Sequence, residues 1–64
     1  MWTEIKKAQN LTTAEMWQAL FEGQGIPTRI MPANGGAMGQ EFATYLILVP
    51  QDKQHIIPEV LRKL

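Results

Sequence analysis

The chain lacks the residues on which several common kinds of site depend. It contains no cysteine, no serine and a single histidine, His55. Without cysteine it can form no disulfide and no thiolate metal site, and one histidine cannot build a typical zinc site. Threonine or tyrosine would need an activating base to act as a nucleophile, and no such pair is visible, since His55 is interpreted as a surface residue. The sequence therefore predicts no metal, no cofactor and no enzymatic activity.

Charge and hydropathy argue against two further classes of function. Six basic and six acidic residues give a formal net charge of zero, whereas non-specific nucleic-acid binding depends on clustered lysine and arginine. No apolar run approaches the roughly 20 residues that span a bilayer, and the segment MWTEIKKAQN has no apolar signal-peptide region. We therefore expect a cytoplasmic protein that binds neither nucleic acid nor a membrane.

The short length of the chain favours association. Its 64 residues are expected to form one domain, residues 1–64, near the lower limit of what folds alone. Domains of this size often add disulfides, a metal or a partner subunit, and the sequence predicts neither of the first two. We expect a homodimer or a protein partner; the alternative is a monomer, since many domains of about 60 residues fold alone.

The segment 12–27 has the pattern of one complete helix followed by a strand. Thr12 and Glu15 have the spacing of a capping box, in which each side chain accepts a hydrogen bond from the other residue's amide. Gly25 suits a left-handed helix end, and Pro27 prevents continuation. The helix, roughly residues 13–24, carries one apolar stripe, made of Ala14, Trp17, Leu20 and Phe21.

Three segments have the composition of strands. Residues 2–8, 28–31 and 42–49 are rich in β-branched, aromatic and aliphatic side chains. The last is an almost unbroken apolar run, typical of a strand buried on both faces. Between the second and third lies Asn34-Gly35, a strong tight-turn dipeptide. We therefore expect these two strands to form an antiparallel hairpin.

The end of the chain, residues 53–64, predicts a second helix with Asp52 as its cap. Pro58 conflicts with a helix interior, because proline removes a backbone hydrogen bond there. The helix is therefore expected to begin later, near Gln54 or His55, or to bend at Pro58, and a later or loosened start is preferred. Its apolar face consists of Ile56, Ile57, Val60, Leu61 and Leu64.

Together these elements predict an α+β fold with the order βαββα. Short connections and a right-handed crossover leave few topologies. We expect a three-stranded sheet with spatial order 2-3-1, the first strand parallel to the third, and both helices on one face. This arrangement is a ferredoxin-like plait that lacks its fourth strand.

The apolar third strand suggests how the protein functions. Its alternate residues point to opposite faces, and the pattern does not decide which set packs on the helices. Monomers seldom expose large apolar patches, so the other set should form an interface through the sheet face or the open edge of the first strand. The alternative is a modest patch covered by Lys7 and Arg29. The residues assigned to the interface are Trp2, Tyr45, Ile47 and Val49.

A glycine-rich loop, residues 34–40, is the one segment that resembles a ligand clamp. Consecutive backbone amides can cradle an anion, but the glycine spacing fits neither the phosphate loop nor the dinucleotide fingerprint. A hairpin loop is the preferred interpretation. The alternative is a small-molecule sensor that binds its ligand at Asn34, Gly35, Gly36 and Gly39.

Two motifs resemble a known family. LFEGQGIP at residues 20–27, preceded by Ala14-Glu15, and YLILVP at residues 45–50, followed by an acidic step into the last helix, are similar to motifs of the prokaryotic signal-transducing protein family. The resemblance covers nearly the whole chain, with departures at Gly23 and Pro58. It implies a ferredoxin-like βαββα fold, related in shape to nitrogen-regulatory signalling proteins, and no recognised catalytic residues. We therefore expect a regulatory or interaction module.

Overall fold

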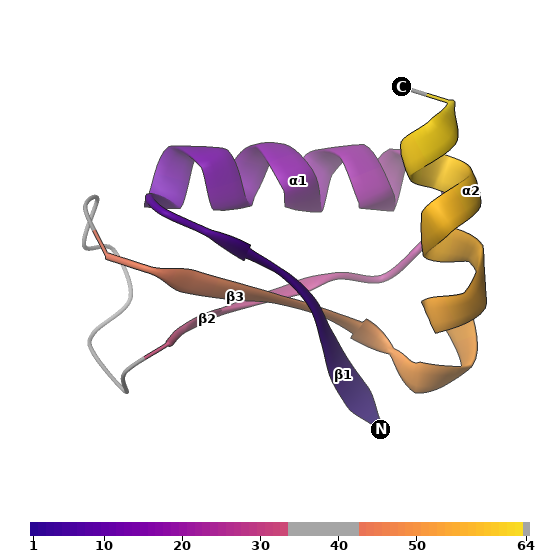
Figure 1. Ribbon diagram of the computed structural model, residues 1–64, viewed down its shortest axis with the longest axis horizontal. Coiled ribbons are helices and arrows are strands. Elements are labelled where there is room, and N and C mark those ends of the chain that lie inside the picture. Colours follow the sequence, from indigo (N-terminus) through magenta and orange to yellow (C-terminus); the bar gives the residue numbers. More distant parts are fainter. Residues whose placement is uncertain (34–42, 64) are drawn as a thin grey trace.

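The computed structural model describes residues 1–33 and 43–63. They form an α+β fold, in which a three-stranded sheet is combined with two α-helices (Figure 1). In chain order the elements are β1 (Trp2–Ala8), α1 (Leu11–Gly23), β2 (Arg29–Pro32), β3 (Tyr45–Pro50), a 3₁₀ helix η1 (Gln51–Ile56) and α2 (Ile57–Arg62).

Strand β3 lies at the centre of the sheet, between β1 and β2. That central position agrees with the sequence prediction, but the predicted parallel pairing of the first and third strands is wrong, because β3 runs antiparallel to both neighbours. Strand β1 and strand β2 therefore run in the same direction, with β3 inserted between them. The connection through α1 is a crossover, the kind of connection that joins strands of the same direction. The chain then reverses its direction after β2, so β3 is antiparallel to both β1 and β2.

The first helix begins earlier than predicted, because Asn10 rather than Thr12 is its cap. The Asn10 side-chain oxygen Oδ1 accepts a hydrogen bond from the Thr13 backbone N–H at 2.7 Å. Asparagine caps a helix at least as well as threonine, and this choice adds Leu11 and Thr12 to the first turn. The predicted capping box of Thr12 and Glu15 is therefore wrong.

The end of α1 follows the sequence prediction. Gly25 has a φ of 82°, the left-handed conformation that glycine adopts without a steric penalty. The Ile26 N–H donates to the Phe21 carbonyl at 3.0 Å, and the Gly25 N–H donates to the Glu22 carbonyl at 3.0 Å. This pair of bonds is a Schellman motif. It directs Ile26 into the interior, where Ile26 and Phe21 are both buried.

Two side-chain hydrogen bonds hold the connection between α1 and β2. Gln18 Nε2 of the helix donates to the Thr28 carbonyl at 3.2 Å. The buried Thr28 hydroxyl Oγ1 donates to the Ile26 carbonyl at 3.0 Å. Both carbonyl oxygens thus gain a partner although they lie outside the sheet ladder, as buried polar groups require. The entry into β2 is fixed relative to the helix that precedes it.

The second α-helix begins late, as Pro58 led us to expect, but at Ile57 rather than near Gln54 or His55. The chain leaves β3 as the 3₁₀ helix η1 and becomes α-helical only at Ile57. Pro58 lies in the first turn of α2, where its missing N–H leaves no intrahelical bond unmade. Neither η1 nor α2 has a side-chain cap, so the predicted role of Asp52 as a helix cap is wrong.

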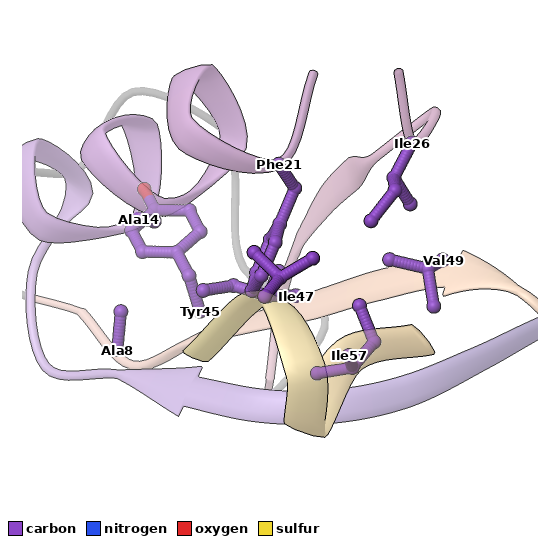
Figure 2. Packing of buried hydrophobic residues seen from close by; sticks show 9 residues of the cluster. Ala8, Ala14, Phe21, Ile26, Tyr45, Ile47, Val49 and Ile57 are labelled. Atoms are coloured by element: carbon purple, nitrogen blue, oxygen red, sulfur yellow. The ribbon is translucent and has the colours of Figure 1, made fainter. Parts of the chain in front are cut away.

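The core lies between the sheet and the helices. Helix α1 runs along one side of the sheet, while η1 and α2 close one end of it (Figure 1). The ring of Tyr45 points from the sheet toward α1, and Ile57 of α2 lies close to the end of the same layer (Figure 2). The buried residues come from β1, β3, both helices and the connection that follows α1, and they are Ala8, Ala14, Phe21, Ile26, Tyr45, Ile47, Val49, Ile57 and Val60.

Candidate functional site

The sheet has one face that no described element covers. Along β3, Tyr45, Ile47 and Val49 are fully buried on the helix side of the sheet, where Tyr45 points toward α1 and Val49 lies near Ile57. The residues between them therefore point to the opposite side. That side, below the strands in Figure 1, carries no helix among the elements that the structure describes. We call it the open face, and its central stripe consists of Leu46, Leu48 and Pro50, which are half-buried.

The strand register identifies the residues that flank this stripe. Directly opposite residues of an antiparallel pair point to the same face of the sheet. Strand β1 places Trp2 opposite Pro50, Glu4 opposite Leu48 and Lys7 opposite Leu46. Strand β2 places Arg29 opposite Leu48 and Met31 opposite Leu46. The flanks of the open face are therefore Trp2, Glu4 and Lys7 on one side and Arg29 and Met31 on the other.

The interface residues predicted on β3 belong to the wrong face. Tyr45, Ile47 and Val49 form part of the core, and a fully buried side chain cannot present a surface of the folded chain. Both sets of β3 residues are apolar, so hydrophobicity alone does not distinguish them. The strand register, which sequence reasoning did not supply, shows that Leu46 and Leu48 take their place. Trp2 remains on the surface, as predicted, with 37% of its area exposed.

Trp2 and Arg29 form a clamp across the central strand. The guanidinium carbon of Arg29 lies 4.6 Å from the centre of the Trp2 ring, within the range of a cation–π interaction. Trp2 is on β1 and Arg29 is on β2, so their side chains meet over β3. The clamp covers part of the apolar stripe. The sequence left this kind of shielding by Arg29 open as the alternative to an interface. Met31 stays 48% exposed beside it.

The charged residues of the open face belong to both of its flanking strands. Glu4 on β1 and Arg29 on β2 are both directly opposite Leu48, so they lie at the same level along the strands. Both side chains are exposed, as is Lys7 one level further along. The charged residues of the open face therefore come from both flanking strands, and the Arg29 guanidinium reaches across β3 to the Trp2 ring.

A β-bulge shapes the side of β1 that faces α1. The strand register shifts between Glu4 and Lys6, and this bulge lets both Ile5 and Lys6 turn toward α1. Ile5 packs against the core, and the Lys6 ammonium lies 4.7 Å from the centre of the Trp17 ring. Trp17 is stacked on Phe21 with 5.7 Å between ring centres. Trp17 is thus part of the packing around the core, as its helical spacing predicts.

The residues that the sequence suggested for a ligand are not placed by the structure. Asn34, Gly35, Gly36 and Gly39 lie outside the described residues. His55 is exposed on η1. Within residues 1–33 and 43–63, no group of three or more acidic, histidine or cysteine side chains could hold a metal ion, and no helix there is long and apolar enough to cross a membrane. The open face is therefore the feature from which we argue function.

Comparison with known proteins adds no assignment to this surface. No protein-family model, curated protein sequence or solved structure matches the chain significantly.

Proposed function

We propose that this chain is a non-enzymatic interaction module that associates with a second copy of itself through the open face. The observation that carries the proposal is the stripe of Leu46 and Leu48, which lies at the centre of an uncovered sheet face. Tryptophan, methionine and arginine are enriched at protein interfaces, and Trp2, Met31 and Arg29 surround this stripe. A domain this short also gains most from a partner.

The face is a better candidate than either edge of the sheet. Strand β2 is four residues long and ends in Pro32, and proline at an edge blocks the pairing of a further strand. Strand β1 is irregular between Glu4 and Lys6, and a bulge twists an edge away from continuous pairing. Both edges thus carry features that oppose extension of the sheet.

We further propose a regulatory role for the dimer, on the basis of the family resemblance. The arrangement of α1 and three strands is what a ferredoxin-like plait lacking its fourth strand would have. The GIP helix end at residues 25–27 and the YLILVP strand resemble the prokaryotic signal-transducing protein family. Such a module acts by changing its partner or its oligomeric state, which suits a chain whose most distinctive surface is apolar.

The proposal predicts that a charge in the stripe weakens association strongly. We expect the wild-type chain to sediment as a dimer at high concentration and Leu48→Lys to sediment as a folded monomer. Loss of a buried leucine removes about 1.5–3 kcal/mol of transfer free energy, which weakens association by about tenfold to a hundredfold. Sedimentation velocity across a wide concentration range measures both species.

Leu61→Lys is the matched control for this experiment. Leu61 is a 37% exposed leucine on α2, remote from the open face, so its replacement should leave the sedimentation of the dimer unchanged. A wild-type chain that remains monomeric at every concentration would contradict the proposal. Equal association of Leu48→Lys and the wild type would contradict it as well.

A further inference from the structure

We infer that the clamp formed by Trp2 and Arg29 is an autoinhibitory contact, which covers the stripe in the single chain and must open before a second copy can bind there. This inference rests on the proposed function and names the step that regulates it. The clamp joins a guanidinium from one edge strand to an indole ring from the other, above the strand between them. Leu48 is directly opposite Arg29, so it lies beneath the closed clamp.

The side chain of Arg29 reaches the Trp2 ring by crossing β3. Arg29 is directly opposite Leu48 on one flank, and Trp2 is directly opposite Pro50 on the other. Because the guanidinium carbon lies 4.6 Å from the ring centre, the aliphatic part of Arg29 passes over the stripe. Arginine lays its aliphatic stem along apolar surface and keeps its charged head in water, and Arg29 as a whole remains exposed. The clamp thus covers apolar carbon without burying a charge.

A closed clamp and a bound partner exclude each other. Sheets that pack face to face interdigitate the side chains of their inner faces, with about 10 Å between the sheets. Each copy would carry its own guanidinium into the apolar centre of such a contact, where a charge without a partner of opposite sign is strongly unfavourable. In a dimer Arg29 therefore has to move to the polar rim, which releases the Trp2 ring and Leu48 for contact with the other copy.

The clamp weakens association because only the open form of the chain can bind. When the binding-competent form is a fraction of the population, the apparent affinity falls by that fraction. A cation–π contact at an exposed site is strong enough to leave about one chain in three to one chain in six open. Both copies must open, so the two clamps together should weaken association about tenfold to fortyfold.

Thiol alkylation tests whether the clamp covers the stripe. The chain has no cysteine, so Leu48→Cys introduces a unique thiol, and its reaction with iodoacetamide is followed at a concentration too low for association. Adding Arg29→Ala should raise the rate about threefold to sixfold, because the thiol reacts when the clamp is open. Adding Trp2→Ala, which opens the clamp from the other flank, should do the same. Rates are compared per thiolate, from the pH dependence of alkylation, because the Arg29 charge itself favours the thiolate.

Two controls separate the clamp from a general loosening of the sheet, and circular dichroism checks that each variant is folded. Lys6→Ala removes a contact of the same chemistry, in which the ammonium lies 4.7 Å from the centre of the Trp17 ring on the side that faces α1. It should leave the alkylation rate at position 48 unchanged. Leu46→Cys places the thiol on the same face of β3 but one level away from Arg29, and Arg29→Ala should leave its rate unchanged.

Sedimentation of chains without an introduced thiol tests the autoinhibition itself. Arg29→Ala should associate about tenfold to fortyfold more tightly than the wild type. An unchanged alkylation rate at position 48 would overturn the inference and leave the proposed function intact. A faster rate combined with equal or weaker association of Arg29→Ala would also overturn it, because the clamp would then not oppose the second copy. If both chains stayed monomeric at every concentration, the inference and the proposed function would fail together.

Discussion

Phe21→Ala is expected to lose about 3–5 kcal/mol of unfolding free energy, the usual cost of truncating a buried phenylalanine. Phe21 is fully buried, is stacked on Trp17 and accepts the hydrogen bond from Ile26 through its carbonyl. A chain of 64 residues has a total stability of only about 3–10 kcal/mol. The variant should therefore unfold at a much lower urea concentration than the wild type, as far-UV circular dichroism would show.

Met16→Ala on the same helix is the control. Met16 is 52% exposed, and exposed positions away from special features usually change stability by no more than about 0.5 kcal/mol. If Phe21→Ala were to cost no more than Met16→Ala, the assignment of Phe21 to the core would be wrong.

Ile47→Ala and Leu48→Ala are expected to differ sharply although the two residues are neighbours. Ile47 is fully buried on the helix side of the sheet, so its truncation should cost about 2–5 kcal/mol and leave a cavity. Leu48 is half-buried on the open face, so its truncation should cost about 1 kcal/mol in the monomer. Measurements at a concentration too low for association separate this effect from loss of the dimer.

The comparison tests which side of β3 faces the helices. Similar losses for the two variants would mean that both faces of the strand are covered, and a larger loss for Leu48→Ala would mean that the faces are reversed. Either outcome would remove the structural basis of the open face.

Local conformational rules explain why much of the fold could be predicted. The end of α1 was predictable because Gly25 has a positive φ, and few residues other than glycine adopt it readily. Strand β1 has the predicted bounds, Trp2–Ala8, because polar residues follow it at once. The late start of α2 was predictable because Pro58 fits only the first turn of a helix. In each case one residue or its nearest neighbours determine the outcome.

The errors arose where the choice depends on contacts distant in sequence. Asn10 and Thr12 are both good caps, and no local rule decides between them. The order of the strands in the sheet does not fix their directions. A hairpin joins antiparallel strands and a crossover joins parallel ones, so the direction of β3 depends on how the chain returns to it. Hydropathy cannot distinguish Ile47 from Leu48, because the two differ only in which side of the sheet they occupy.

The candidate site was predictable in kind but not in detail. A continuous apolar strand, with side chains on both faces of the predicted sheet, predicted an exposed surface. Its charged residues were not identified as a set, because Glu4 and Arg29 are far apart in sequence and meet at one level only through β3. The sequence did hold one signal for this surface. Ile30 packs against the core, and side chains alternate along a strand, so its neighbours Arg29 and Met31 point to the opposite face.

Methionine oxidation tests the central claim most directly, because the chain has a matched pair of methionines. Met31 lies on the open face with 48% of its area exposed, and Met16 lies on α1 with 52% exposed. Peptide mapping after brief peroxide treatment gives the oxidation rate of each. We predict that the rate at Met31 falls as protein concentration rises into the dimeric range, while the rate at Met16 stays constant. An oxidation rate at Met31 that stays constant over the whole concentration range, as at Met16, would show that the open face is not the surface through which the chain associates.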